Sequence, residues 1–110
     1  MAFTAYHNIT GSTGINIELI AVGEGISSIN SIVIANTHAT ADATVSMFIQ
    51  NEPTAAVTKT FYMFKTVAIP SDTSLLLDNK SMLSFDNSTV GYGLYLTVGG
   101  SDTLDVMINR

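Results

Sequence analysis

The chain has 110 residues, no cysteine and a formal net charge of -5. This length fits a single domain, and the lack of cysteine excludes disulfides, thiolate metal ligands and a cysteine nucleophile. The cationic side chains are few and scattered, at Lys59, Lys65, Lys80 and Arg110, so they cannot neutralise a run of phosphates and exclude nucleic acid and anionic membranes as partners.

The composition carries a surplus of apolar residues. Charged residues make up 12% of the chain and hydrophobic residues 46%, whereas charged residues average about 25% in soluble domains. A small domain cannot hide that much apolar surface internally, which predicts that another protein covers part of its outer face. The alternative is a monomer with a surface rich in Ser, Thr and Asn.

The first residues contain neither a basic segment nor an apolar one, and no later run reaches the ~20 apolar residues of a membrane span. We expect a protein without a membrane span or a cleaved secretion signal.

The hydrophobic periodicity is that of β-strands along the whole chain. Apolar residues alternate or cluster in short runs that are separated by Gly, Asn, Asp and Pro. The segment Asn51 to Thr60 is the one place where a helical turn competes. The predicted strands are Ile15 to Leu19, Ile26 to Ala35, Thr44 to Ile49, Thr60 to Ile69, Ser74 to Leu77, Met82 to Phe85, Tyr92 to Val98 and Leu104 to Ile108.

Strands of this length at a spacing of about 8 to 12 residues are typical of a sandwich or barrel. The sequence therefore predicts an all-β fold, namely one antiparallel, jelly-roll-like β-sandwich of about eight strands over residues 1–110. Residues 1–14 form either an N-terminal arm or an edge strand in this prediction.

Catalytic machinery is not predicted. The only histidines are His7 and His38, and Gly-x-Ser-x-Gly is absent. A pair of His38 with Asp42 beside a Ser or Thr is conceivable, but hydroxyl residues are so abundant that this proximity carries little weight. Both histidines are interpreted as solvated residues, His38 in a loop and His7 near a strand end.

The aspartates also favour a structural interpretation. Most lie in predicted turns, where a carboxylate usually accepts from nearby backbone N–H groups. Their spacing resembles no calcium loop, so we predict no metal and no cofactor. The residues concerned are Asp72, Asp78, Asp86, Asp102 and Asp105.

Tyrosines on a β-sandwich are able to form a sugar-binding platform. Tyr6, Tyr62, Tyr92 and Tyr95 are available, but tryptophan is absent. In the strand from Tyr92 to Val98, we assign Tyr92, Leu94, Leu96 and Val98 to the core face and Tyr95 to the opposite face.

Several segments follow one another in a distinctive order. A strand ending in Ala35-Asn36-Thr37 leads through a polar loop into the strand Ala43 to Ile49, and Val67 to Pro70 later precedes Ser74 to Leu77 and a closing strand, Leu104 to Ile108. In this order the chain from about Val22 to its end resembles small β-sandwich virion proteins of tailed bacteriophages. It departs from them at Phe85-Asp86-Asn87, where such proteins often carry Gly-Asp.

The resemblance implies a non-enzymatic virion protein made in the host cytoplasm. Such a protein is a capsid decoration (cement) protein or a tail, neck or baseplate component, often trimeric, and its partners are its own copies and the major capsid or tail protein. Two alternatives to a virion protein stay open. One is a carbohydrate-binding or adhesion module, and the other is an enzyme.

We expect an edge strand or the segment Met1 to Thr10 to pair with a neighbouring subunit, which would hide exposed backbone groups. Five apolar residues appear surplus to a two-sheet core and are the predicted interface, namely Phe3, Tyr6, Phe61, Met63 and Tyr95.

Overall fold

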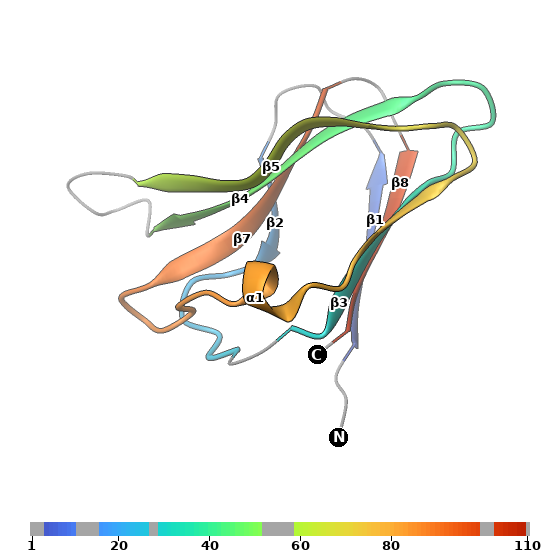
Figure 1. Ribbon diagram of the computed structural model, residues 1–110. Helices are drawn as coiled ribbons and strands as arrows, with labels where there is room; N and C mark the ends of the chain where they lie inside the picture. Colours follow the sequence, from blue (N-terminus) through green and yellow to red (C-terminus); the bar gives the residue numbers. More distant parts are fainter. Residues whose placement is uncertain (1–3, 11–15, 27–28, 52–58, 100–102, 110) are drawn as a thin grey trace.

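The computed structural model describes residues 4–10, 16–26, 29–51, 59–99 and 103–109 (Figure 1). Eight strands and one short helix make up this part of the chain. In chain order they are β1 (Thr4–Thr10), β2 (Asn16–Ile20), β3 (Ser31–Asn36), β4 (Ala43–Asn51), β5 (Thr60–Ile69), β6 (Ser74–Leu77), α1 (Lys80–Leu83), β7 (Tyr92–Val98) and β8 (Thr103–Asn109).

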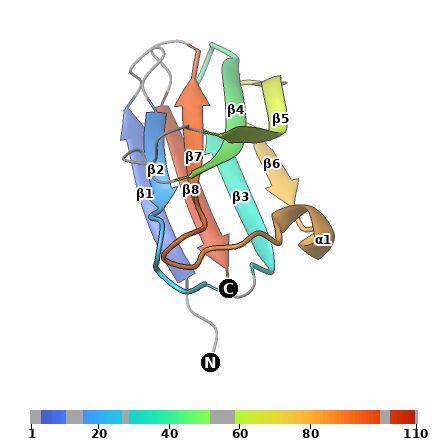
Figure 2. The same ribbon diagram turned by 90° about the vertical axis from the view of Figure 1, so that its left-hand side faces the viewer.

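The strands form two four-stranded antiparallel sheets. The first sheet has the order β1-β8-β3-β6 and the second has the order β2-β7-β4-β5. The two sheets lie as layers with the core between them (Figure 2). The first strand pairs with the last, the second with the seventh, the third with the sixth and the fourth with the fifth, which is the nested pairing of a jelly roll. The predicted fold class is confirmed.

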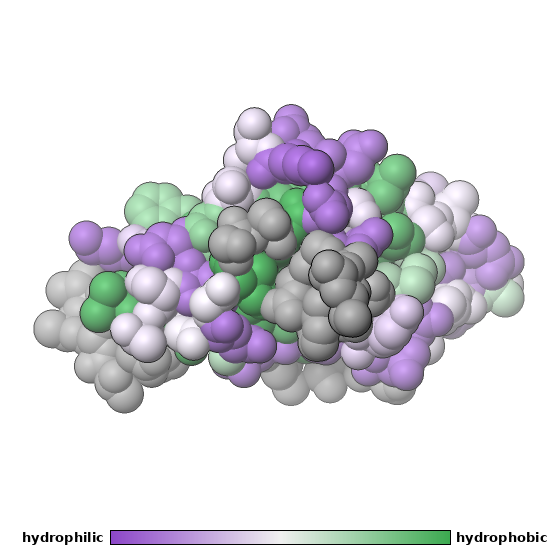
Figure 3. Space-filling view, turned by 90° about the horizontal axis from the view of Figure 1, so that it is seen from below, coloured by the Kyte–Doolittle hydropathy of each residue, from purple (hydrophilic) through white to green (hydrophobic). Residues whose placement is uncertain are grey.

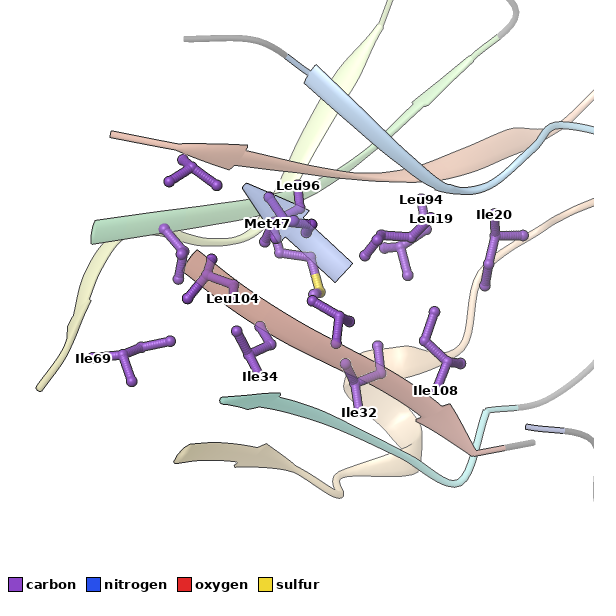
Figure 4. Packing of buried hydrophobic residues seen from close by; sticks show 14 of the residues in the cluster. Leu19, Ile20, Ile32, Ile34, Met47, Ile69, Leu94, Leu96, Leu104 and Ile108 are labelled. Carbon is purple, nitrogen blue, oxygen red and sulfur yellow. The ribbon is translucent and has the colours of Figure 1, made fainter. Parts of the chain in front are cut away.

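The core is made by alternate residues of both sheets. From the first sheet, Ile32, Ile34, Leu104, Val106 and Ile108 point inward and are fully buried. In Figure 4 Ile32, Ile34, Leu104 and Ile108 face Leu94 and Leu96 of the second sheet, and Met47 reaches into the space between the layers. Replacing one of these leucines by alanine is expected to cost about 2–5 kcal/mol.

The strand predicted over Met82 to Phe85 is wrong. The chain forms the single-turn helix α1 there, because the Asn79 side chain caps it by accepting from the backbone N–H groups of Ser81 at 3.0 Å and Met82 at 3.3 Å. Leu83 is buried, and Met82 and Phe85 pack against the core. The apolar residues of this segment thus contribute to the core from a capped helical turn and the residues after it, not from a strand.

Strand β5 is bent and irregular (Figure 1). Its register with β4 shifts on both sides of Met47, and Thr66 has a φ of 56°, a left-handed conformation that is unfavourable for a β-branched residue. The Thr66 N–H donates to the Ser46 hydroxyl at 2.9 Å. These irregularities separate the apolar first half of β5 from its second half, which continues the pairing with β4 at the edge of the sheet.

The interpretation of His7 as a solvated residue near a strand end is wrong. His7 lies in the middle of β1, opposite the buried Val106 of β8, and its side chain is on the inner side of the sheet. Its Nε2 atom is buried and has no hydrogen-bond partner among the described residues.

Candidate interaction surfaces

The outer face of the first sheet carries a row of apolar side chains that crosses all four strands. Tyr6 of β1 lies opposite Met107 of β8, Met107 opposite Val33 of β3, and Val33 opposite Leu76 of β6. Tyr6 is 72% exposed, Leu76 57% and Met107 38%. We call these four residues the apolar row.

The rows beside the apolar row are polar but almost uncharged. The next row consists of Asn8, Asp105, Ala35 and Ser74, and Asn109 and Ser31 lie on the other side. The Asn8 amide donates to the Asp105 carboxylate at 2.6 Å, which occupies one oxygen of the only ionisable side chain among these residues. The result is an apolar strip framed by hydrogen-bonding groups, which is the composition of a protein interface.

Aromatic rings that pack against one another cover the outer face of the second sheet. Phe48 of β4 stacks on Tyr95 of β7 with ring centroids 5.7 Å apart, and Tyr62 of β5 lies 5.2 Å from Phe48 on the other side. Phe48 and Tyr95 are therefore only 3% and 8% exposed. The Lys65 ammonium lies 5.1 Å from the centre of the Tyr62 ring, a cation–π contact.

Gly93 makes room for this stack. A Cβ atom at position 93 would lie 2.7 Å from the Ile20 carbonyl oxygen and 3.1 Å from the Tyr95 hydroxyl oxygen. A side chain at this position would therefore push the Tyr95 ring away from the sheet.

The five predicted interface residues do not form one patch. Tyr6 belongs to the apolar row, and Tyr95 belongs to the stack on the other sheet. Phe61 is 54% exposed and meets Tyr92 edge to face at 5.8 Å, whereas Met63 packs against the core. Phe3 lies outside the described residues.

Sequence reasoning missed three of the four residues in the apolar row. A signal was present in each strand. Met107 is out of phase with the inward residues Leu104, Val106 and Ile108, and three consecutive leucines at 75–77 oblige the middle one to face away from the core. Their alignment with Tyr6 and Val33 becomes visible only once the strand pairing is known.

His38 organises its own loop. Its Nδ1 atom accepts from the backbone N–H groups of Thr40 and Ala41, both at 3.1 Å, and its own N–H donates to the Asn36 side-chain oxygen at 3.0 Å. The imidazole nitrogen that a His–Asp pair would use is committed to the backbone. This agrees with a structural residue in a loop.

Two buried asparagines fasten the loops at opposite ends of the sandwich. Asn36 donates to the carbonyl oxygens of Ala41 and Ile69 at 2.9 and 3.0 Å. Asn87 donates to those of Ala21 and Tyr92 at 2.9 and 2.8 Å, and its side-chain oxygen accepts from Ile26 N–H at 3.1 Å. Asn87 is therefore a structural clamp between these loops.

The described carboxylates form no cluster suited to a metal ion, and Asp102 lies outside the described residues. Asp86 accepts from the Ser88 backbone N–H at 3.0 Å, and this hydrogen bond together with one from the Ser88 side chain holds the pKa of Asp86 below its usual value. Within the described ranges no group of three or more His, Asp or Glu residues is placed to hold a metal ion.

The described segments include no helix with the length and apolar character needed to span a membrane. At the end of the sandwich that Figure 3 shows, hydrophobic residues appear between polar ones. The candidate interaction surfaces of this protein are the two outer sheet faces and the edges of the sheets.

No family model matches the chain, and the comparisons with curated proteins and with solved structures also gave no match.

Proposed function

We propose that this protein is a non-enzymatic structural protein of a tailed-phage virion, a capsid decoration protein that docks on the shell and stabilises it. The observation that carries the docking role is the apolar row on the outer face of the first sheet. The assignment to a tailed-phage particle rests on the resemblance in strand order and motifs between Val22 and the C-terminus. The jelly-roll fold is compatible with this role but does not select it, because viral capsid proteins, lectins and enzymes share the fold.

The geometry suits a subunit that covers a surface. Four apolar side chains in line on a stiff sheet offer a strip about 14 Å long from the first strand to the fourth, since neighbouring strands are about 4.8 Å apart. The polar rows beside it supply hydrogen-bonding groups for the rim of a contact. A protein that binds the assembled shell but not the free shell subunits stabilises the shell by mass action.

A sugar-binding module is supported less well. Such a site needs aromatic rings open to solvent, and in the stack on the second sheet only Tyr62 is half-exposed, with Lys65 beside its ring. Placement on a tail, neck or baseplate would use the same apolar row and differs only in the partner.

The test is binding of purified variants to phage shells that lack the protein. The double variant Tyr6→Ser, Leu76→Ser removes the two most exposed side chains of the row and is expected to bind at least ~30-fold more weakly, because truncating interface anchors typically costs 1–2 kcal/mol or more each. Val90→Ser is the matched control, since Val90 is 88% exposed but lies outside the sheet faces.

Wild-type affinity for both variants, or no binding of wild-type protein to shells, would contradict the proposal. Binding to tails and not to shells would move the role to the tail.

A further inference from the structure

The four edge strands of the sandwich differ in how they are protected from pairing with another chain. Bulges, charged residues and short length are the usual protections. Strand β6 has only four residues, β2 carries a register shift and the exposed Glu18, and β5 carries two register shifts and the exposed Lys65. Each of these three edges has at least one such protection.

Strand β1 has none of them. Its register with β8 runs without interruption from Thr4 opposite Asn109 to Thr10 opposite Thr103. The seven residues include no Pro, Lys, Arg, Asp or Glu. Figure 2 shows β1 at the open side of its sheet.

The hydrogen-bond pattern shows which backbone groups of β1 face this open side. The Thr37 N–H donates to the Thr103 carbonyl at 3.0 Å, in register with the pairing of β3 and β8. Bonded pairs alternate along an antiparallel ladder, so Val106 directs its backbone groups to β1 and its partner His7 is bonded to β8. The backbone groups of Tyr6 and Asn8 consequently point away from the sheet.

These outward-facing backbone groups, which are unpaired among the described residues, match a second copy of the same strand. In an antiparallel pair centred on His7, Tyr6 lies opposite Asn8 of the other copy and Thr4 opposite Thr10. All four of these positions direct their backbone groups to the open side, so the pair forms about eight backbone hydrogen bonds over the full length of β1. A shift by two residues in either direction loses part of this overlap, and no like charges meet in the register.

In this register His7 lies opposite His7 of the second copy in a non-bonded pair, where Cα atoms are about 4.5 Å apart and side chains are closest. The pair places the two imidazoles on the inner side of the joined sheet and leaves the bonds of His7 to β8 unchanged.

We infer that β1 is a self-pairing edge, through which two copies of this protein join into one continuous eight-stranded sheet about a two-fold axis. This inference is independent of the virion role. The axis is perpendicular to the sheet, so the apolar rows of both copies face the same side and contact one surface together. A two-fold pair is also a different assembly from the trimer that the resemblance implies.

The experiment compares Asn8→Pro with Asn8→Ala by light scattering over a dilution series. Both variants lose the Asn8–Asp105 hydrogen bond, but only proline removes the N–H that faces the open edge, and it leaves the bonds of His7 to β8 in place. Wild type and Asn8→Ala are expected to have twice the 11.7 kDa mass of the chain. Asn8→Pro is expected to dissociate at a concentration at least ~10-fold higher or to be monomeric throughout.

Amide hydrogen exchange of the wild-type protein tests the same contact without a variant. On dilution the Tyr6 amide should lose protection, while the His7 amide, bonded to β8, should keep it. A monomeric or trimeric wild type at ~100 μM, an Asn8→Pro protein as dimeric as Asn8→Ala, or fast exchange of the Tyr6 amide at every concentration would each overturn the inference.

Discussion

Single polar side chains fix the loops of this sandwich, and Asn36 is the clearest case. It is the last residue of β3, is buried, and satisfies two carbonyl groups and one N–H group from three different positions. Asparagine fits because its amide offers both donors and an acceptor at one end of a short side chain. The loop between β3 and β4 thereby stays attached to the end of β5.

Replacing Asn36 by alanine should lower the free energy of unfolding by about 2–4 kcal/mol, because buried backbone groups lose their partners. Urea denaturation measures this change. Thr37→Ala, which removes an exposed hydrogen bond to Thr103 at 3.1 Å, is the control and should cost about 1 kcal/mol or less. Equal losses for the two variants would show that Asn36 is not a clamp.

Asp86 gives the protein a pH-dependent contribution to stability. Its folded pKa is depressed by the hydrogen bonds from Ser88. The contribution is therefore present above the unfolded pKa of about 3.9 and is lost as the pH falls through the lower folded value. Asp86→Asn should melt below the wild type at pH 6, and the difference should shrink as the pH falls below the unfolded pKa of about 3.9. A difference in Tm that stays constant from pH 6 to pH 3 would refute this account.

At the scale of elements, periodicity predicted most of the strands but not their pairing. Alternation was enough to identify Tyr92 to Val98 and Leu104 to Ile108 as strands, and in the first of them it also identified Leu94, Leu96 and Val98 as inward residues. The helix α1 was missed since an asparagine cap outweighs a four-residue apolar run. For residues 1–14 the sequence left an N-terminal arm and an edge strand open, because Tyr6, His7 and Asn8 give no clean alternation, and the structure has the edge strand β1 there.

The candidate surface was predictable only in part for a related reason. Tyr6 was singled out as surplus apolar surface, but the apolar row depends on the registers of three strand pairs between residues far apart in sequence. No local pattern contains that information. The aromatic stack likewise turned Tyr95 from an expected contact residue into a largely covered one.

Thr66 is the strained position of β5 and tests how that strand is built. Asparagine tolerates the left-handed conformation better than a β-branched residue. Thr66→Asn should therefore raise the free energy of unfolding by about 0.5–1 kcal/mol, measured by urea denaturation. Thr103→Asn, at an exposed threonine of β8 with ordinary strand geometry, should not be stabilised. A destabilised Thr66→Asn protein would show that the threonine side chain matters more than its backbone strain.

At the scale of the whole molecule, the sandwich leaves an almost uncharged, partly apolar sheet face and one edge strand, β1, without the usual protections. Part of the surplus of apolar residues in the composition lies on this sheet face, in the apolar row. A continuous sheet through β1 would place two apolar rows on one side, and two linked contacts hold a surface more tightly than one. This is the arrangement expected of a subunit that reinforces a larger shell.

The central claim is that this protein is part of a tailed-phage shell. Quantitative mass spectrometry of virions purified from infected cells that produce the protein tests this claim most directly. The account predicts that the protein is present in a fixed, high ratio to the major capsid protein and remains through repeated particle purification. A few copies per particle would place it in the tail or neck instead of on the shell. Its absence from virions, with the protein found only in the soluble lysate, would contradict the structural role.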